Sequence, residues 1–289
     1  MNVSIGVMAY NEERNIDNLL NTLLNQRTNK INIKEIIVIS SGSTDKTNEI
    51  VQRFSKKNKK IKLIVEKKRK GKSHAINVFL KKAKSKILVL ESADTIPKQE
   101  TIEILCSKLI NPKIGIAGGK PVPLKNNNKL MDFIVQLQWQ LHHEISKSKP
   151  KFGELITFKK VMNKIPLTAV DEEEIASIIK KKGLELVYEP KAAVYNRGPE
   201  TIKEFIRQRR RIYAGHLELR KRKKYEASTL RSTKILMAIL KEKMFFKNIP
   251  FLIIAMILES TGRLLGIIDF CTKKNLVVWK VSETTKTLK

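Results

Sequence analysis

Cysteine is scarce in this chain of 289 residues, which carries only Cys106 and Cys271. The two lie far apart and belong to no CxxC pair. Disulfide frameworks and zinc sites need more cysteines at closer spacing, so we expect neither and take a reducing compartment as the default. The chain begins with the strand-like NVSIGVMAY and not with a basic segment followed by a long apolar run, so we expect no signal peptide.

Acidic and aromatic residues are also few. Asp and Glu number 28 against 58 Lys and Arg, the formal charge is +30, the pI is ≈ 10.1, and aromatic residues make up 6%. Positive charge favours anionic partners such as nucleotide phosphates, anionic lipid or nucleic acid, although a lysine-rich genome would produce the same excess. No helix-turn-helix, zinc-finger or RNP-like motif accompanies the charge, so we predict no nucleic-acid partner.

Hydrophobic residues, at 42%, suffice for a folded core. In the first third of the chain, apolar β-branched runs alternate with amphipathic helical patterns. The predicted strands there are Val3–Ala9, Ile36–Ile39, Ile61–Val65 and Ile87–Leu90. This alternation predicts an α/β fold with a mainly parallel sheet flanked by helices. Further strands and helices are expected at Ile114–Gly119, Leu130–Ile145, Phe152–Val161, Leu184–Tyr188, Ala192–Tyr195 and Lys203–Lys224.

Polar turns follow three of these strands, at Tyr10–Glu13, Ser40–Asp45 and Glu91–Asp94. The carboxyl ends of parallel strands meet at one edge of a sheet, where such sheets bind ligands, so we expect the turns to converge. Each turn alone could simply close a strand. Together they indicate one ligand, and the Asp94 carboxylate is the kind of oxygen ligand that a divalent cation holding a diphosphate requires.

A second acidic cluster, Asp171–Glu174, opens a predicted helix that ends at Gly183. Carboxylates at a helix N-terminus interact favourably with the helix dipole, which accounts for part of the cluster. One positioned carboxylate could also deprotonate a hydroxyl as a general base. The later basic helix contains Gln208 and Arg211. A charge run of this kind is usually a solvated face, but one of its arginines could reach a diphosphate.

The C-terminal stretch Ile249–Phe270 is largely apolar, and its only charged residues are Glu259, Arg263 and Asp269. Glu259 and Arg263 are four residues apart and can pair on one helix face. The stretch is long enough to span a bilayer and also fits an interfacial helix, whereas a buried core helix is the alternative. We favour membrane contact and leave the topology open. The basic residues that would flank an interfacial helix are Lys241, Lys243 and Lys247.

Taken in order, the motifs between Val3 and Gly215 resemble those of the family 2, GT-A-fold, nucleotide-sugar glycosyltransferases. None of them is specific alone, but six occur in the family's order. They are Ala9-Tyr10-Asn11-Glu12-Glu13 against the nucleobase, Ser40–Asp45 as the base-reading turn, Gly71-Lys72, Ser92-Ala93-Asp94 in the place of the Asp-x-Asp metal motif, the acidic pair Asp171-Glu172, and Gln208 with Arg211 of the Gln-x-x-Arg-Trp element.

The resemblance implies a GT-A fold and transfer of a sugar, with inversion, from a nucleotide diphosphate sugar. It implies Mn²⁺ or Mg²⁺ on Asp94, where the cation neutralises the departing diphosphate. It assigns the catalytic base to Glu172, or to Asp171 beside it, and stacks the nucleobase on Tyr10. The nucleotide-sugar-binding residues that it implies are Ala9, Tyr10, Glu12, Ser40, Ser41, Lys72, Ser92, Ala93, Gln208 and Arg211.

Three departures from the family pattern bear on these expectations. Ser92 replaces the first Asp of the metal motif, so Asp94, alone or with Glu91, would hold the ion. Ser40-Ser41 stands where an acidic residue often contacts the base, which leaves the nucleotide open. Ile212 stands in the place of the Trp, so we predict addition of a single sugar and not processive synthesis.

We therefore expect a GT-A glycosyltransferase domain over residues 1–225, nucleotide-binding at about 1–97 and acceptor-binding at about 98–225, and a helical membrane-associating segment over 226–289. The acceptor would be a glycan or a polyprenyl or other lipid phosphate, at the cytoplasmic face of the membrane. The alternative is a degenerate, non-catalytic protein of the same fold that binds a nucleotide or anionic lipid. A nucleotidyltransferase would need a glycine-rich basic loop where this chain has AYNEE.

Overall fold

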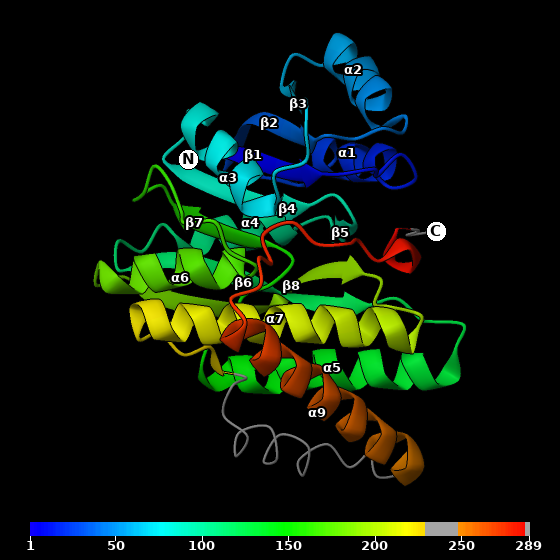
Figure 1. Cartoon of the computed structure of the whole chain (residues 1–289). Coiled ribbons are helices and arrows are strands. Elements are labelled where there is room, and N and C mark those ends of the chain that lie inside the picture. Colours follow the sequence, from blue (N-terminus) through cyan, green and yellow to red (C-terminus); the bar gives the residue numbers. More distant parts are fainter. Residues whose placement is uncertain (229–247, 287–289) are drawn as a thin grey trace.

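The structure is a computed structural model that describes residues 1–228 and 248–286 (Figure 1). An eight-stranded sheet lies at its centre, with helices around it. In chain order the elements are β1 (Asn2–Ala9), α1 (Ile16–Leu24), β2 (Asn32–Ser41), α2 (Thr47–Lys57), β3 (Ile61–Glu66), α3 (Lys72–Lys82), β4 (Ile87–Ser92), β5 (Thr95–Pro97), α4 (Thr101–Lys108), β6 (Ile114–Pro123), α5 (Lys129–Ser148), β7 (Ile156–Lys159), α6 (Asp171–Lys181), β8 (Glu185–Asn196), α7 (Ile202–Lys223), α9 (Ile249–Cys271) and the 3-10 turn η3 (Glu283–Thr285).

The strands lie in the order β3-β2-β1-β4-β7-β6-β8-β5. β3, β2, β1 and β4 are parallel, as are β6 and β8, while β7 and the edge strand β5 run antiparallel to their neighbours. β1 and β4 are buried along almost their whole length, which is why their sequences are continuous apolar runs and not alternating patterns. The predicted α/β fold with a mainly parallel sheet is confirmed.

Helices cover both faces of the sheet. α1, α2 and α4 pack on one face through Leu19, Val51 and Leu105. α3 and α6 pack on the other face through Phe79 and Ile179. Because these apolar faces fix each helix against the sheet, the turns that lead into α1, α2 and α3 are held at the carboxyl-end edge of the parallel strands.

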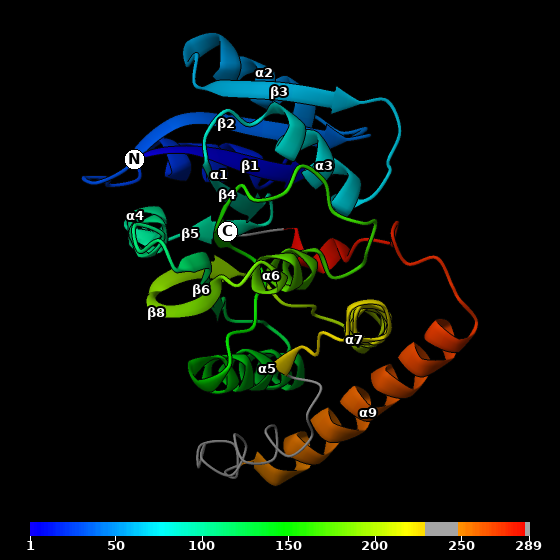
Figure 2. The same cartoon turned by 90° about the vertical axis from the view of Figure 1, so that its left-hand side faces the viewer.

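A third layer, formed by α5, α7 and α9, lies beyond the sheet (Figure 2). Ile134, Phe205 and Leu252 belong to its shared core, one from each helix. α9 approaches α7 closely because Gly262 faces it: a Cβ at this position would lie 2.7 Å from the Cβ of Arg209. The layer therefore places α9 on the outside of the molecule, held through α7.

The two faces of α9 differ. Its inner face pairs with α7: Arg209 Nε donates to Glu259 Oε2 at 2.6 Å, and Arg210 pairs with Asp269. Glu259 also pairs with Arg263 at 2.7 Å, as predicted from their spacing. α9 is the single helix within residues 1–228 and 248–286 that is long and apolar enough to cross a membrane. Its exposed apolar side chains are Ile249, Ile253, Met256, Ile257, Leu264, Ile267 and Ile268. The flanking Lys241, Lys243 and Lys247 lie outside the described residues.

Several strands extend beyond their predicted bounds, and β2 runs from Asn32 to Ser41 where only Ile36–Ile39 was expected. β6 continues past Gly119 to Pro123. The two short strands expected on either side of Glu189 form the single strand β8, because β8 pairs with β6 before and after a register shift at Gly119/Lys120. Turn-forming residues at that point bend the strand without ending its pairing.

After α9 the chain turns back toward the sheet. Residues 272–286, red in Figures 1 and 2, run from the end of α9 toward β5. η3 is tied to the start of α7, because the N–H of Glu283 donates to Glu204 Oε1 at 2.9 Å and the N–H of Glu200 donates to Thr284 Oγ1 at 3.1 Å. Residues 272–286 therefore lie against the sheet edge where the polar turns meet.

Candidate active site

One cavity of ≈ 750 Å³ opens at this edge of the sheet. Eleven of the thirteen residues singled out from the sequence line it: Ala9, Tyr10, Glu12, Ser41, Lys72, Ser92, Asp94, Asp171, Glu172, Gln208 and Arg211. The other two, Ser40 and Ala93, are buried outside its wall. The Ser40 hydroxyl donates instead to Ser43 Oγ at 2.8 Å. The three polar turns and the second acidic cluster therefore meet at one place.

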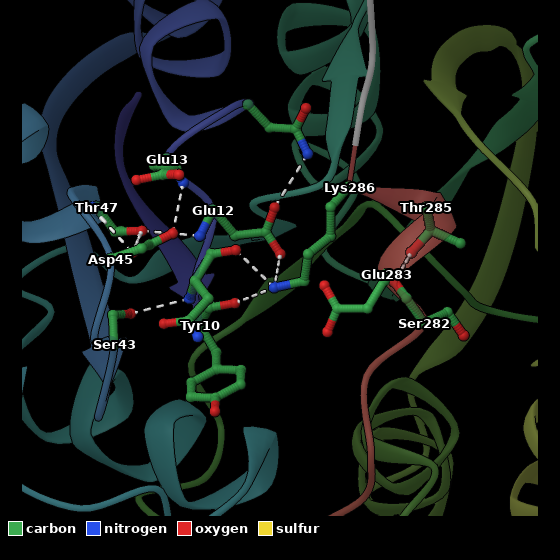
Figure 3. A network of polar contacts seen from close by, with 12 residues as sticks. Tyr10, Glu12, Glu13, Ser43, Asp45, Thr47, Ser282, Glu283, Thr285 and Lys286 are labelled. Atoms are coloured by element: carbon green, nitrogen blue, oxygen red, sulfur yellow. Dashed lines mark hydrogen bonds and ion pairs between the residues drawn. The ribbon is translucent and has the colours of Figure 1, made fainter.

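Hydrogen bonds hold the first two turns together (Figure 3). The N–H of Glu12 donates to Thr47 Oγ1 at 2.7 Å, and the N–H of Glu13 donates to Asp45 Oδ2 at 3.1 Å. Asp45 also accepts the N–H of Thr47 at 3.0 Å, which fixes the start of α2. Within the first turn, Asn11 has a left-handed φ of 52°, a conformation that asparagine tolerates. The second turn thus orders the backbone that follows β1.

Two cations lie against the Tyr10 ring. The guanidinium carbon of Arg69 is 4.0 Å from the ring centroid, and Lys286 Nζ is 5.3 Å away, both within cation–π range. The Lys286 ammonium also donates to the carbonyl oxygens of Tyr10 at 2.6 Å and Asn11 at 2.5 Å, and it lies 3.4 Å from Glu12 Oε1 (Figure 3). The aromatic ring at this turn is thus surrounded by positive charge.

The C-terminal segment supplies site residues that sequence reasoning missed. Trp279 packs over Arg211, with the guanidinium carbon 3.8 Å from the ring centroid. The Val277 carbonyl lies against Gly71, which has a left-handed φ of 93° and no room for a Cβ. Lys286 is 276 positions from the first carbonyl that it binds. No local pattern could have revealed contacts over such a separation.

Carboxylates crowd the cavity. Glu154, which sequence reasoning also missed, lines it and accepts a hydrogen bond from Asn196 Nδ2 at 3.1 Å. Burial and the Asp94 charge raise the pKa of Glu154 to about 7. Burial and Asp94 likewise raise the pKa of Glu12 to about 8, and burial raises the pKa of Asp94 itself. Like charges in a poorly solvated place resist ionising together, and a bound cation would relieve that repulsion.

The donor set around Asp94 fits a hard divalent cation, because carboxylate oxygens are the ligands that Mg²⁺ and Mn²⁺ prefer. In the described parts of the chain, no three His, Cys, Asp or Glu side chains form a ready-made metal cage. None is required, since Mg²⁺ is usually held by one or two carboxylates together with waters and substrate phosphates. Glu91, the alternative ligand, is fully buried against Thr95 and does not line the cavity.

Lys72 connects α3 to the acidic cluster. Its Nζ lies 2.6 Å from Glu172 Oε1 and donates to Ser92 Oγ at 3.0 Å. Burial alone would raise the pKa of Glu172, but the charge and hydrogen bond of Lys72 lower it. Burial and the Glu172 carboxylate raise the pKa of the neighbouring Asp171 to about 7. The pair therefore combines an ionised carboxylate with one that holds a proton more tightly.

The four acids at the start of α6, Asp171–Glu174, have different partners. Glu173 accepts the N–H of Phe152 at 2.8 Å. Glu174 pairs with Arg222 of α7 at 2.6 Å and is fully buried. These contacts, together with the helix dipole, give the last two acids, Glu173 and Glu174, a structural explanation. Only the first two remain as candidates for chemistry.

The carboxyl-end edge of the parallel strands thus gathers the Asp94 carboxylate, the basic side chains Lys72 and Arg211 and the acidic pair Asp171-Glu172 in one cavity, at the place where open α/β sheets bind ligands. The chain belongs to glycosyl transferase family 2, whose model matches residues 4–170. The family expected from the motifs is thereby confirmed, and the matched residues form a family 2 glycosyltransferase domain.

Among curated proteins, the chain is 27% identical over 252 residues to poly-β-1,6-N-acetyl-D-glucosamine synthase of Staphylococcus epidermidis, covering 82% of this chain and 60% of the relative. The synthase of Staphylococcus aureus strain COL is 28% identical over 225 residues, covering 73% and 53%. The chain thus spans little more than half the length of these relatives.

Solved structures share the fold. A mannosyltransferase of Pyrobaculum calidifontis, in complex with GDP-Man and Mn²⁺, matches with a TM-score of 0.67 at 19% identity, covering 94% of this chain and 88% of that one. TarS residues 1–349 of S. aureus, in complex with UDP-GlcNAc, matches with a TM-score of 0.52 at 18% identity, covering 75% and 67%. The expected GT-A fold is confirmed.

Proposed function

We propose that this chain moves a sugar from a nucleotide diphosphate sugar to a hydroxyl of a glycan acceptor or to a lipid phosphate. We further propose that the transfer inverts the anomeric carbon, needs Mn²⁺ or Mg²⁺ and adds one sugar per encounter. The observation that carries the proposal is the meeting of Asp94, Lys72 and Glu172, from three distant parts of the chain, in one cavity.

The nucleotide is proposed to lie along the turn after β1. Tyr10 would offer its aromatic ring to the base in place of the Arg69 guanidinium that now lies over the ring, while Lys72 and Arg211 offer charge to the diphosphate. Asp94 would hold the divalent cation, which supplies charge neutralisation for the departing diphosphate. Mn²⁺ in the related mannosyltransferase structure supports this choice of cofactor. The remaining binding residues proposed are Ala9, Glu12, Ser41, Ser92 and Gln208, which line the cavity.

Glu172 is the proposed catalytic base. Because Lys72 keeps its pKa low, the carboxylate is ionised at neutral pH and able to accept a proton. The acceptor oxygen bonds to the anomeric carbon while the bond from that carbon to the diphosphate oxygen breaks. The electron pair leaves with the nucleotide diphosphate, and the acceptor proton passes to Glu172. Asp171 is the alternative base.

We propose that residues 1–225 form the transferase domain, with 1–97 binding the nucleotide and 98–225 the acceptor. Within 226–289, α9 is proposed to contact the membrane, while residues 272–286 return to the donor pocket. Ile212 lines the cavity where the family has a Trp, which supports addition of single sugars.

We infer that α9 lies on the cytoplasmic face of the membrane and does not cross it. A spanning helix would have to leave α7, and that would break the pairs of Arg209 with Glu259 and Arg210 with Asp269. An interfacial helix keeps these pairs and buries only its exposed apolar face in lipid.

UDP-GlcNAc is the donor to test first. The synthases that match this chain are named for a polymer of N-acetylglucosamine, and the TarS complex contains UDP-GlcNAc. GDP-mannose is the second choice, because it is bound in the related mannosyltransferase structure.

The test is release of nucleotide diphosphate from UDP-GlcNAc, UDP-glucose, GDP-mannose and a dTDP-sugar, with Mn²⁺ or EDTA, and with undecaprenyl phosphate or a mixture of oligosaccharides as acceptor. Wild type is compared with Asp94→Ala, Glu172→Gln and Asp171→Asn. Glu218→Gln, an exposed position on α7, serves as the control.

Release from one donor that is abolished by EDTA and by Asp94→Ala is the expected result. If Glu172 is the base, Glu172→Gln lowers acceptor-dependent transfer roughly 10³-fold, with a smaller loss in Asp171→Asn. Undiminished release in EDTA contradicts the metal proposal. Tight nucleotide binding without release from any donor would favour the non-catalytic alternative.

A further inference from the structure

Glu154 lies across from the end of β4, beside the turn that carries Asp94. β7 runs antiparallel to β4, and the last pair of residues between the two strands is Leu90 with Ile156. Continued by two residues, this register sets Glu154 opposite Ser92, two positions before Asp94. Glu154, Ser92 and Asp94 all line the cavity. The fold thus brings a second carboxylate to the end of β4 from a distant part of the chain.

The Glu154 side chain is held through one oxygen and open at the other. Its Oε1 accepts a hydrogen bond from Asn196 Nδ2 at 3.1 Å. Asn196 is itself buried and pairs in the sheet with Thr95, the residue after Asp94, so it holds Glu154 firmly. Within residues 1–228 and 248–286, Glu154 Oε2 has neither a hydrogen bond nor an ion pair, and it is accessible. That oxygen is available to a ligand in the cavity.

Asp94 and Glu154 both lack a cation to balance their charge. In the described parts of the chain, neither acid forms an ion pair with a basic side chain. Lys72, on the same wall, is paired with Glu172 at 2.6 Å. After burial, the charge of Asp94 raises the pKa of Glu154 most, so the two carboxylates lie near each other. Two uncompensated carboxylates in a poorly solvated place suit a hard divalent cation.

We propose that Glu154 is the second carboxylate ligand of the divalent cation, in place of an acid at position 92. The inference rests on the proposed metal-dependent transfer and names the residue that completes its cation site. Ser92 offers only a hydroxyl there, and that hydroxyl already accepts a hydrogen bond from Lys72 Nζ at 3.0 Å. Asp94 and Glu154 would share the ion with water and the donor diphosphate, the usual way in which Mg²⁺ is held.

Two other acids are also influenced by the Asp94 charge, but they suit the ion less well. Glu12 Oε1 lies 3.4 Å from the Lys286 ammonium, which balances its charge. Glu91 is fully buried and does not line the cavity. Of the three acids, only Glu154 lines the cavity without a cationic partner among the described residues.

The backbone at Glu154 is held in an uncommon conformation. Its φ of 53° is left-handed, which is unfavourable for a residue with a long side chain. The next residue fixes the segment to the sheet, because the N–H of Gly119 donates to the Leu155 carbonyl at 3.3 Å. Residues in such conformations recur at ligand-binding sites, where the surrounding structure maintains them. The fold therefore keeps Glu154 at the cavity wall against a local backbone preference.

The test measures cation binding directly and not only activity. Mn²⁺ is titrated into wild type, Glu154→Gln, Asp94→Asn and Glu12→Gln, and the free ion is followed by electron paramagnetic resonance. The affinities for UDP and GDP are measured with Mn²⁺ and with EDTA. Glu154→Gln keeps the oxygen that Asn196 binds, and its unfolding midpoint in EDTA checks that it is folded. Glu185→Gln, at the exposed start of β8, is the control.

Glu154→Gln and Asp94→Asn are each expected to weaken Mn²⁺ binding at least about tenfold, while nucleotide affinity in EDTA stays within about twofold of wild type. Ser92→Asp supplies a carboxylate opposite position 154. In that background Glu154→Gln is expected to weaken Mn²⁺ binding less than about threefold, because either acid can then serve the ion. A purely structural role of Glu154 would not be rescued in this way.

Unchanged Mn²⁺ binding in Glu154→Gln overturns the assignment, as does a larger loss in Glu12→Gln or the absence of Mn²⁺ binding by wild type with and without nucleotide. An equal loss of nucleotide affinity with Mn²⁺ and with EDTA would assign Glu154 to the nucleotide instead. If wild type binds Mn²⁺ but releases no nucleotide diphosphate from any donor, the proposed function is contradicted, and the Mn²⁺ titrations still decide the role of Glu154.

Discussion

Lys72 links the two halves of the candidate active site, because its ammonium contacts both Glu172 on α6 and Ser92 at the end of β4. We predict that Lys72→Met lowers kcat/KM for nucleotide-sugar turnover roughly 10²-fold, since it removes a preorganised charge. It should also shift the acid limb of the pH–rate profile upward, because Lys72 holds the pKa of Glu172 down and burial raises it once that charge is gone. Lys70→Met, in the exposed loop before α3, is the control. An acid limb that stays in place would argue against Glu172 as the base.

The crowded carboxylates predict a pH dependence of stability. Between about pH 5 and pH 8 the folded protein keeps protons on Glu154, Glu12 and Asp171 that the unfolded chain has released, so the free energy of unfolding should fall as pH rises. Glu154→Gln should reduce this fall by roughly 1–2 kcal/mol, measured by denaturant unfolding at both ends of the range. Glu185→Gln, at an exposed position, should leave it unchanged. The same pH dependence in both variants would contradict the prediction.

At the residue scale, the sequence revealed the groups that lie close to a strand end. Asp94 and the turn at Tyr10 follow buried strands directly, so topology alone brings them together. It could not reveal Glu154, which precedes β7 and lies in no motif, with a left-handed φ of 53°. Nor could it rank Asp171 and Glu172, because their difference arises from the ion pair with Lys72 across the cavity.

At the element scale, residues 272–286 predict an effect on donor binding. Trp279 covers the guanidinium of Arg211 and helps to hold it at the cavity wall. We predict that Trp279→Ala raises KM for the nucleotide sugar about five- to tenfold, in proportion to a cation–π contact of roughly 1 kcal/mol. Trp279→Phe, which keeps an aromatic face, should lie close to wild type. An unchanged KM in Trp279→Ala would mean that the segment only rests on the site.

Sequence patterns predicted the helices and strands better in some parts of the chain than in others. Those of the first third of the chain were predicted well, because each is bounded by a turn that its own residues specify. The return of the chain after α9 was not, since the contacts of η3 with Glu204 and Glu200 join segments about eighty residues apart. Composition identified α9 as a membrane candidate, but only its ion pairs with α7 show which face is available.

At the scale of the whole molecule, α7 connects the cavity to the apolar helix α9. α9 packs on α7, and α7 carries Gln208 and Arg211 to the cavity wall. A protein resting on a membrane through α9 would therefore have its acceptor side near the lipid surface. The excess of positive charge, +30 over the chain, adds attraction to anionic headgroups that falls with salt.

The exposed face of α9 predicts reversible membrane binding. Purified protein should sediment with vesicles that contain anionic lipid, and it should do so more weakly at high salt. Ile257→Glu and Leu264→Glu should each reduce the bound fraction at least tenfold, because a side chain buried in lipid contributes roughly 1.5–3 kcal/mol. Ile110→Glu is the matched control: Ile110 is 58% exposed, as is Ile257, but lies beyond α4 and away from the apolar face. Resistance of the wild type to extraction by salt and alkaline carbonate would instead indicate a helix that crosses the bilayer. Equal binding by all variants would remove α9 from the contact and leave charge alone to explain it.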